Sequence, residues 1–545
     1  MVTQITGGRI IDPANGRDGT GDVWIRDGRI VEAPSSGVTA DETYDAGGTI
    51  VMAGGIDIHS HIAGSNVNTA RLLLPEYHRA FAARPAKTPL SEIGWGTFET
   101  GCLYAAMGFT MVVEPAVAPH HALHAHLELA DIPIIDKATL SILGNDDYLL
   151  GLMRKNENGS AVRDYVAWTL ATSRALGIKV VNAGGAVAFK SNVRAFALDD
   201  VVPFYGVTSR AIVKTLQRAV NELGVPHPLH VHCNNLGLAG NADTALATIA
   251  AAEGLPLHLA HLQFYGYGKE GERGFSSAAP SLAEAVNGAK NVTVDVGQVM
   301  FGQTVTISSD VLRQFNALGH ARPKKWVIFD GDSNGGGIVP YNYRSKDFYN
   351  AVQWCVGLEL FLLISDPWRV FFTTDHPNGA PFTTYPEILA LLMDHDLRAK
   401  WIETLPPAAV QMTTLPSITR EYSLTEIATM TRAAPAKLLG LKDRGHLGAG
   451  AIADIAVYAD DADRAKMFRA AALVFKNGEL VVREGQVTHP RWGRAITVDA
   501  RYDMAIEQRM RDYYEDRYGV PYDFMAVPES AIGRPDPFES VPCAS

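Results

Sequence analysis

Histidines and one aspartate stand where apolar runs of this chain end. His59 and His61 form a His-x-His pair after Gly-Gly-Ile-Asp-Ile, His232 ends Leu-His-Val-His, His261 ends Leu-His-Leu-Ala-His, and Asp375 ends Val-Phe-Phe-Thr-Thr-Asp. Residues two apart on a strand face the same side, so the imidazoles of His59 and His61 converge. Imidazole and carboxylate groups are ligands for Zn²⁺ and similar metals. Together these residues predict a metal site, although a lone His-x-His pair is also found as a structural feature.

Other histidines have plainer interpretations. His230 and His258 precede two of the candidate ligands and are interpreted as core or supporting residues. A cluster in the segment PAVAPHHALHAHLELA is interpreted mainly as the polar face of a helix; its members are His120, His121, His124 and His126.

Lys179 lies in the apolar run Gly-Ile-Lys-Val-Val, which predicts a buried strand. A free ammonium is costly to bury unless it is paired or chemically altered. A lysine with a lowered pKa can react with CO2 to form a carbamate, which turns a cation into a carboxylate able to bridge two metals. The alternatives are an internal ion pair of Lys179 with an aspartate, and Lys190 as the carbamate.

Composition excludes several classes of function. The 545 residues include 48 Lys and Arg against 59 Asp and Glu, a net charge of −11, which argues against general nucleic-acid binding. The four cysteines form no Cys-x-x-Cys pair, which excludes a disulfide framework and a cysteine-bound zinc or iron–sulfur site. The N-terminus lacks a signal-peptide pattern, and no run reaches the length of about 18 apolar residues that a membrane helix needs. We therefore expect a cytoplasmic protein.

The elements that must position these residues alternate between apolar strands and helices. Buried parallel strands form continuous apolar runs because helices cover their outer face. Eight such runs predict an α/β fold, a distorted (β/α)8 barrel, whose carboxyl strand ends face the active site. The runs are 54–62, 108–116, 177–185, 228–235, 256–262, 292–297, 326–331 and 370–377.

Both ends of the chain are rich in short strands and turns, which predicts one small β-sandwich domain built from the two ends. We expect residues 1–52 and 441–500 to form this domain and residues 53–440 to form the barrel. Residues 501–545 are expected to be a tail, with subunit docking and a frayed terminus as alternatives.

These motifs together resemble the amidohydrolase superfamily, close to its dihydroorotase and hydantoinase branch, over about residues 1–490. "GGIDIHSH" (54–61) is similar to the metal motif of its first strand, "HCNN" (232–235) to the fifth-strand motif and "TTDHP" (373–377) to the eighth-strand motif. Lys179 falls where that branch has a carboxylated lysine, and His261 falls at its sixth-strand histidine.

Three further segments resemble the family of A subunits of formylmethanofuran dehydrogenases and, above all, of bacterial formyltransferase/hydrolase complexes. They are residues 65–78, 96–119 and 373–394. The resemblance implies hydrolysis of the N-formyl group on formyl-methylofuran or formylmethanofuran, giving formate and the free amine. It implies a role in one-carbon metabolism, as in methylotrophy, within a multi-subunit complex, on a furan-type carrier with a polyglutamate tail.

The resemblance also implies roles for the site residues. Two divalent metal ions, zinc in our interpretation, would be held by His59, His61 and Asp375 on one side and by His232 and His261 on the other. Carboxylated Lys179 would bridge them, and Asp375 would serve as general base and then as general acid.

Candidates for substrate binding lie close to these ligands in sequence. Asn182, Asn234 and Asn235 are expected to orient the formyl oxygen, and Phe264 and Tyr265 are expected to flank the furan ring unless their loop faces solvent. The polyglutamate tail is at odds with an acidic chain, and it requires a partner protein or a basic patch. The weak candidates for that patch are Arg71, Arg79 and Arg84, which ordinary surface ion pairs would equally explain.

Two other functions remain open at this point. A stand-alone cyclic amidase of the hydantoinase or dihydroorotase type shares the metal site, but it has no counterpart to the insertion at 65–100 or to the chain after residue 490. A non-catalytic scaffold subunit has no physical need for a full ligand set and a buried lysine.

Overall fold

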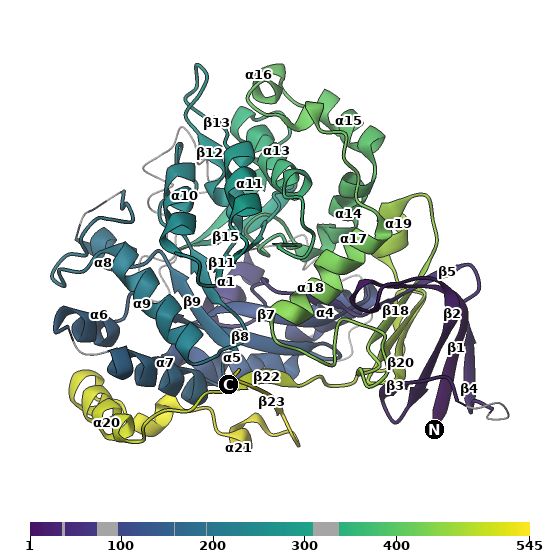
Figure 1. Cartoon of the computed structure of the whole chain (residues 1–545), viewed down its shortest axis with the longest axis horizontal. Coiled ribbons are helices and arrows are strands. Elements are labelled where there is room, and N and C mark those ends of the chain that lie inside the picture. Colours follow the sequence, from purple (N-terminus) through teal and green to yellow (C-terminus); the bar gives the residue numbers. More distant parts are fainter. Residues whose placement is uncertain are drawn as a thin grey trace.

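The computed structural model describes residues 1–34, 39–73, 96–156, 159–191, 193, 195–308 and 337–544. Figure 1 shows a central α/β unit with a β unit at its right and the C-terminal segment along its lower edge. No helix within these residues combines the length and the apolar character that crossing a membrane requires.

Eight parallel strands curl around a common core in chain order. They are β6 (Gly55–Asp57), β7 (Phe109–Val117), β8 (Asp136–Leu143), β9 (Gly177–Val181), β10 (Leu229–His232), β11 (Leu257–Leu259), β14 (Val292–Asp295) and β17 (Val370–Phe371). The first and last strands approach each other just beyond their ends, where Ser60 and His376 form a parallel bridge and the His61 N–H donates to the His376 carbonyl at 2.8 Å. The predicted α/β barrel class is confirmed.

One of the eight strands differs from the prediction. The third strand is β8, whereas the sequence pattern favours residues 326–331, which lie outside the described residues. The run DKATLSIL does not read as a buried strand because Asp136, Lys137, Thr139 and Ser141 interrupt its apolar residues. All four polar side chains are nevertheless buried, and three of them have polar partners inside the protein.

Helices surround the curled sheet, and α9 illustrates how a helix buries an apolar face against it. In α9, the Thr208 hydroxyl caps the helix by accepting from the Ala211 N–H, and Ile212, Leu216 and Val220 repeat at helical spacing toward the core. The helices are α1 (Ser65–Leu72), α4 (Thr97–Ala106), α5 (Ala122–Asp131), α6 (Asp147–Arg154), α7 (Gly159–Ser173), α8 (Gly185–Lys190), α9 (Ser209–Glu222), α10 (Ala242–Ala251), α11 (Ala279–Gly288), α13 (Phe348–Leu363), α14 (Tyr385–Met393), α15 (His395–Glu403), α16 (Pro407–Val410), α17 (Leu424–Ala428), α18 (Ala434–Leu438) and α19 (Arg464–Arg469).

A nine-stranded mixed sheet combines both ends of the chain, as predicted. Its strands are β1 (Val2–Asp12), β2 (Arg17–Arg26), β3 (Arg29–Val31), β4 (Glu42–Asp45), β5 (Thr49–Ala53), β18 (Ile455–Ala459), β19 (Leu473–Lys476), β20 (Glu479–Arg483) and β21 (Gln486–Val487). The two ends join where β5 pairs antiparallel with β18, with Met52 opposite Ala456. Asn477 and Gly478 both have positive φ in the β19–β20 turn, which explains the Asn-Gly sequence there.

The C-terminal segment returns to the barrel. β22 (Ala495–Asp499) pairs parallel with β8, and β23 (Phe538–Pro542) adds to β22, with α20 (Ala505–Tyr518) and α21 (Glu529–Ile532) between them. The Trp168 indole N–H of α7 donates to the Tyr522 hydroxyl at 2.8 Å. The division of the chain into domains stays a proposal, and the pairing of β22 favours ending the β domain before residue 495.

Two short antiparallel strand pairs lie beyond the carboxyl ends of the barrel strands. β12 (Tyr267–Gly268) pairs with β13 (Ser276–Ser277), and β15 (Gly302–Ser308) pairs with β16 (Gly337–Tyr343). Val305 of β15 and Ile338 of β16 pack against Ala70 of α1. The β15–β16 pair also lines one side of the cavity described next.

Candidate metal centre

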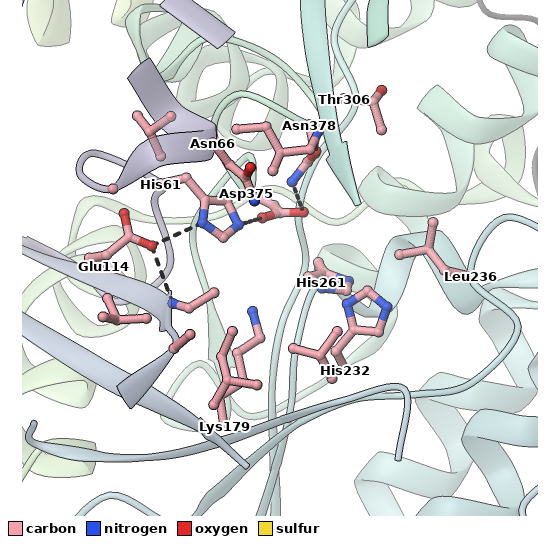
Figure 2. A pocket seen from close by; sticks show the side chains of 18 of the residues that line it. His61, Asn66, Glu114, Lys179, His232, Leu236, His261, Thr306, Asp375 and Asn378 are labelled. Atoms are coloured by element: carbon pink, nitrogen blue, oxygen red, sulfur yellow. Dashed lines mark hydrogen bonds and ion pairs between the residues drawn. The ribbon is translucent and has the colours of Figure 1, made fainter. Parts of the chain in front are cut away.

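One cavity opens at the carboxyl ends of the barrel strands. Its lining includes His61, Lys179, His232, His261 and Asp375. In Figure 2 their side chains point toward a common space, although they come from five different strand ends. The sequence-predicted residues therefore converge.

Side-chain nitrogens and one carboxylate oxygen lie within contact distance of each other. Asp375 Oδ1 is 3.1 Å from His59 Nε2 and 3.3 Å from His61 Nε2. His59 is fully buried, and its Nε2 also lies 3.2 Å from Lys179 Nζ. His59, His61 and Asp375 form one buried group with the spacing of metal ligands, and His59, His230 and Asp295 form another.

The first group fits a divalent metal. Two imidazole nitrogens and a carboxylate oxygen converge there, as zinc sites require. Nδ1 of buried His261 has no hydrogen-bond partner within the described part of the chain. Buried polar atoms are normally satisfied, so this nitrogen is consistent with a ligand that completes its bonding.

The pKa of the cavity lysine, Lys179, is shifted by its surroundings. Burial lowers the pKa of Lys179 below its usual value, although Asp375, Asp295 and Glu114 oppose that change. Lys179 forms no ion pair with a carboxylate among the described residues, so the internal ion pair expected as an alternative finds no partner. The side chain of Lys190, the rival carbamate candidate, lies outside what the structure describes.

Glu114, which sequence reasoning missed, supports the second histidine of the pair. Its Oε1 lies 3.0 Å from His61 Nδ1, and its Oε2 accepts the backbone N–H groups of Ile62 at 2.6 Å and Ala63 at 3.0 Å. Burial alone would lower the pKa of His61, but Glu114 and Asp375 raise it to about 9. The signal in the sequence was a carboxylate within the otherwise apolar strand FTMVVE.

Asp295, also missed, lies beneath the first histidine. Asp295 Oδ2 is 3.0 Å from both His59 Nδ1 and His258 Nε2, and Oδ1 accepts the His261 backbone N–H at 2.7 Å. His230 Nε2 is also 3.0 Å from His59 Nδ1. The interpretation of His230 and His258 as supporting residues agrees with this network. Asp295 had a detectable signal as well, because it ends the run VTVD of β14.

Two of the expected ligands lie at residues with left-handed backbone conformation. His261 has φ 33° and Asp375 has φ 52°. Such conformations cost free energy in residues other than glycine, and they concentrate at functional sites. Gly297 allows this geometry at His261, because a Cβ added there would lie 2.5 Å from the His261 Cβ.

The three asparagines expected to orient substrate do not line the cavity. Asn234 Nδ2 donates to the Ser209 hydroxyl at 2.8 Å, and Asn235 Oδ1 accepts the Phe196 N–H at 2.9 Å. Asn182 is buried, with its backbone N–H bonded to the His232 carbonyl at 3.0 Å. The chain turns sharply after each strand, and Asn182 and Asn235 have the positive φ that asparagine tolerates.

The two aromatic candidates differ in position. Phe264 lines the cavity, whereas the hydroxyl of Tyr265 donates to the Cys233 carbonyl at 2.8 Å. The ring of Tyr265 stacks on His261 at 5.7 Å between centroids and meets His232 edge-on at 5.8 Å. Tyr265 is thus placed to hold the two histidines rather than a substrate. The loop that carries Phe264 and Tyr265 is buried, not solvent-exposed.

Arg71, proposed for a basic patch, is buried and bonds to the Asn68 side chain at 2.6 Å and to the Ile62 carbonyl. Arg79 and Arg84 lie outside the described residues. In the histidine cluster at 120–126, His126 of α5 is buried and donates to the Ser173 carbonyl at 3.0 Å, whereas His121, which directly precedes α5, lines the cavity.

Comparisons with known proteins agree with the fold and the site. A model described as the amidohydrolase family matches residues 42–489. The FhcA subunit of the formyltransferase/hydrolase complex of Methylorubrum extorquens is 52% identical over 549 residues, covering 100% of this chain and 100% of that protein. Protein FwdA of Methanocaldococcus jannaschii is 39% identical over 520 residues, 91% of each chain. The crystal structure of the M. extorquens complex FhcABCD with methylofuran contains a chain that superimposes with a TM-score of 0.95, at 52% identity and 100% coverage of both chains.

Proposed function

The chain belongs to the amidohydrolase family, and on that premise we propose that it hydrolyses the N-formyl group of formyl-methylofuran or formylmethanofuran to formate and the free amine. The observation that carries this proposal is full-length similarity, at 52% identity, to the FhcA subunit of a formyltransferase/hydrolase complex. The buried histidine and aspartate groups at the mouth of the barrel provide the chemistry that such a reaction needs.

The site is suited to two divalent ions, which we propose are zinc. His59, His61 and Asp375 would hold one ion, His232 and His261 the other, and carboxylated Lys179 would bridge them. Bound metals of this kind polarise a carbonyl oxygen and lower the pKa of water to about 7. The observations that support the pairing are the shared cavity and the nearness of Lys179 to His59.

Asp375 is the proposed general base and acid. Its Oδ2 accepts the Asn378 amide at 2.9 Å, which leaves Oδ1 directed at His59 and His61. Burial would raise the pKa of Asp375, but His261 and His59 outweigh it and keep the carboxyl ionised. An ionised carboxylate held in this way can accept a proton from attacking water and pass it to the leaving nitrogen.

The proposed substrate and partners follow from the relatives. The M. extorquens complex was crystallised with methylofuran, and we propose a furan carrier of the same kind for this chain. We also propose that the chain works in the cytoplasm as one component of such a complex. With Arg71 buried and a net charge of −11, a partner protein of the complex is the favoured receiver of a polyglutamate tail.

Metal removal tests this function. The chain, purified with its partners, is treated with a chelator and assayed for formate released from formyl-methylofuran, with metal content measured in the same sample. We expect two metal ions per chain, loss of release with their removal and recovery with added zinc. No release by metal-loaded protein would contradict the proposal, and cleavage of a cyclic amide instead would support the hydantoinase-type alternative.

A further inference from the structure

We propose that Asp295 is a positioning residue that orients both proposed metal positions at once, through the side chain of His59 and the backbone of His261. This assignment rests on the proposed metal-dependent function. Asp295 ends β14 and is fully buried beneath the site, and it does not line the cavity. It therefore acts through other residues and does not touch substrate.

The Oδ2 atom of Asp295 fixes the tautomer of His59. Asp295 Oδ2 lies 3.0 Å from His59 Nδ1, so this nitrogen carries the proton and Nε2 presents its lone pair. Nε2 is the nitrogen that faces Asp375 and Lys179. A carboxylate behind a ligating histidine fixes the ring and increases its basicity.

Neighbouring histidines are compatible with this tautomer. His258 Nε2 lies 3.0 Å from the same Asp295 oxygen, to which it donates, so Nδ1 of a neutral His258 accepts from the Thr293 hydroxyl at 2.8 Å. A proton on His59 Nδ1 requires His230 Nε2, 3.0 Å away, to be an acceptor, and His230 then donates from Nδ1 to His227 Nε2 at 3.0 Å.

The Oδ1 atom of Asp295 holds the backbone of His261. Asp295 Oδ1 accepts the His261 N–H at 2.7 Å, at a residue with φ 33°. That conformation is unfavourable for histidine and persists only if surrounding contacts determine it. Asp295, the last residue of β14, bonds to His261 in this conformation. Gly297, two residues later, leaves room for it.

Only a carboxylate satisfies all of these donors. Asp295 accepts from His59, His258 and the His261 backbone, whereas an asparagine offers one oxygen and one N–H donor group. If the amide oxygen faces His261, the amide N–H groups face the two imidazoles and force His59 to carry its proton on Nε2. If the amide is reversed, its N–H groups oppose the His261 N–H.

The variants Asp295→Asn and Glu114→Gln separate this role from a general structural one. Glu114 contacts one proposed ligand, His61, and its other bonds are to backbone N–H groups, among them those of Ile62 and Ala63, so we expect Glu114→Gln to weaken one metal position. We expect Asp295→Asn to weaken both, each by about 10- to 100-fold in zinc affinity. Glu359→Gln is the control, because Glu359 is a fully buried carboxylate bonded to Ser277 and Thr414, away from the cavity lining.

Zinc affinity is measured on the assembled complex by competition with a chromophoric chelator, and the absorption spectrum of the cobalt-loaded protein reports ligand geometry. Zinc affinities in Asp295→Asn within twofold of the wild type, or a loss confined to one ion, would overturn the proposal. Its failure is distinguishable from failure of the proposed function, because metal binding is measured without any formyl substrate.

A structure of the zinc-loaded wild type provides the second test if Asp295→Asn does not fold. We expect His59 to bind metal through Nε2 while Nδ1 stays within hydrogen-bond distance of Asp295. Ligation through Nδ1, or a separation from Asp295 beyond about 3.5 Å, would overturn the assignment.

Discussion

Lys179 illustrates how position in the fold changes the chemistry of a residue. Its strand neighbours are apolar, and its ammonium group ends in a cavity among histidines and carboxylates. Burial lowers its pKa, which increases the fraction of neutral amine available to react with CO2. The short distance to His59 would place the proposed carbamate beside the proposed metals.

Replacing Lys179 with alanine should remove the proposed bridge between the two proposed metal positions. We expect Lys179→Ala to lose metal and formate-releasing activity, and short carboxylic acids to restore part of both by occupying the space left. Metal analysis and formate assays with and without added acetate check this. Unchanged metal content would point instead to Lys190 or to a mononuclear site.

The ligand candidates and two supporting histidines, His230 and His258, could be predicted from the sequence, but the roles of the two supporting carboxylates could not. His59, His61, His232, His261 and Asp375 each close an apolar run, so one strand argument applies to all of them. Asp295 and Glu114 also lie on strands, yet their roles depend on contacts 236 and 53 residues away in the chain. The three asparagines do not line the cavity, because proximity in sequence to a ligand does not decide which way a side chain points after a strand.

At the scale of elements, buried charges connect barrel strand β8 to β19 of the mixed sheet and to the C-terminal strand β23. Asp136 at the start of β8 lies 2.7 Å from Lys476 of β19 and 3.0 Å from Arg444. Lys476 also lies 2.6 Å from Asp454, and Arg444 lies 2.8 Å from Glu539 of β23. Burial opposes ionisation of Asp136, but Lys476 and Arg444 outweigh it and hold its pKa below the usual range.

Asp136→Asn should destabilise the folded chain by about 3–5 kcal/mol at neutral pH, because it leaves buried cations without their shared partner. A carboxyl group whose pKa is lower in the folded than in the unfolded state stabilises the fold at pH values above its unfolded-state pKa of about 3.9. This stabilisation is lost as the pH falls toward the folded-state pKa. The difference between wild type and variant should therefore shrink in acid.

Urea denaturation at several pH values measures this effect. Glu253→Gln is the control, since Glu253 pairs with Lys214 at the surface, where solvent screens the pair. An Asp136→Asn variant as stable as Glu253→Gln at neutral pH would show that the buried cluster does not hold the elements together.

The elements themselves were predictable to different degrees. Continuous apolar runs identified seven of the eight barrel strands. β8 was missed because its buried polar residues are paired with groups from distant elements, among them Lys476 and Ser173. A strand whose polarity is satisfied by tertiary contacts has no local pattern to detect.

On the scale of the whole molecule, both ends of the chain pack beside the barrel. The N-terminal strands and residues 455–487 share one sheet, while residues 495–542 run along the barrel, as Figure 1 shows. The expected tail is thus largely folded onto its own chain, with Ala544 bonded to Gly224 at 2.7 Å. Whether its outer face docks a partner stays a proposal, as does the use of a partner to bind an acidic carrier.

We propose that this chain hydrolyses a formamide with Asp375 as its general base and acid. The most direct test of this proposal is formate release by the assembled complex, given formyl-methylofuran in water enriched in ¹⁸O, with wild-type and Asp375→Asn chains compared. We predict one labelled oxygen in each formate, and release that is slower by about 10²- to 10⁴-fold in Asp375→Asn. Unlabelled formate, or release by Asp375→Asn at the wild-type rate, would contradict the claim.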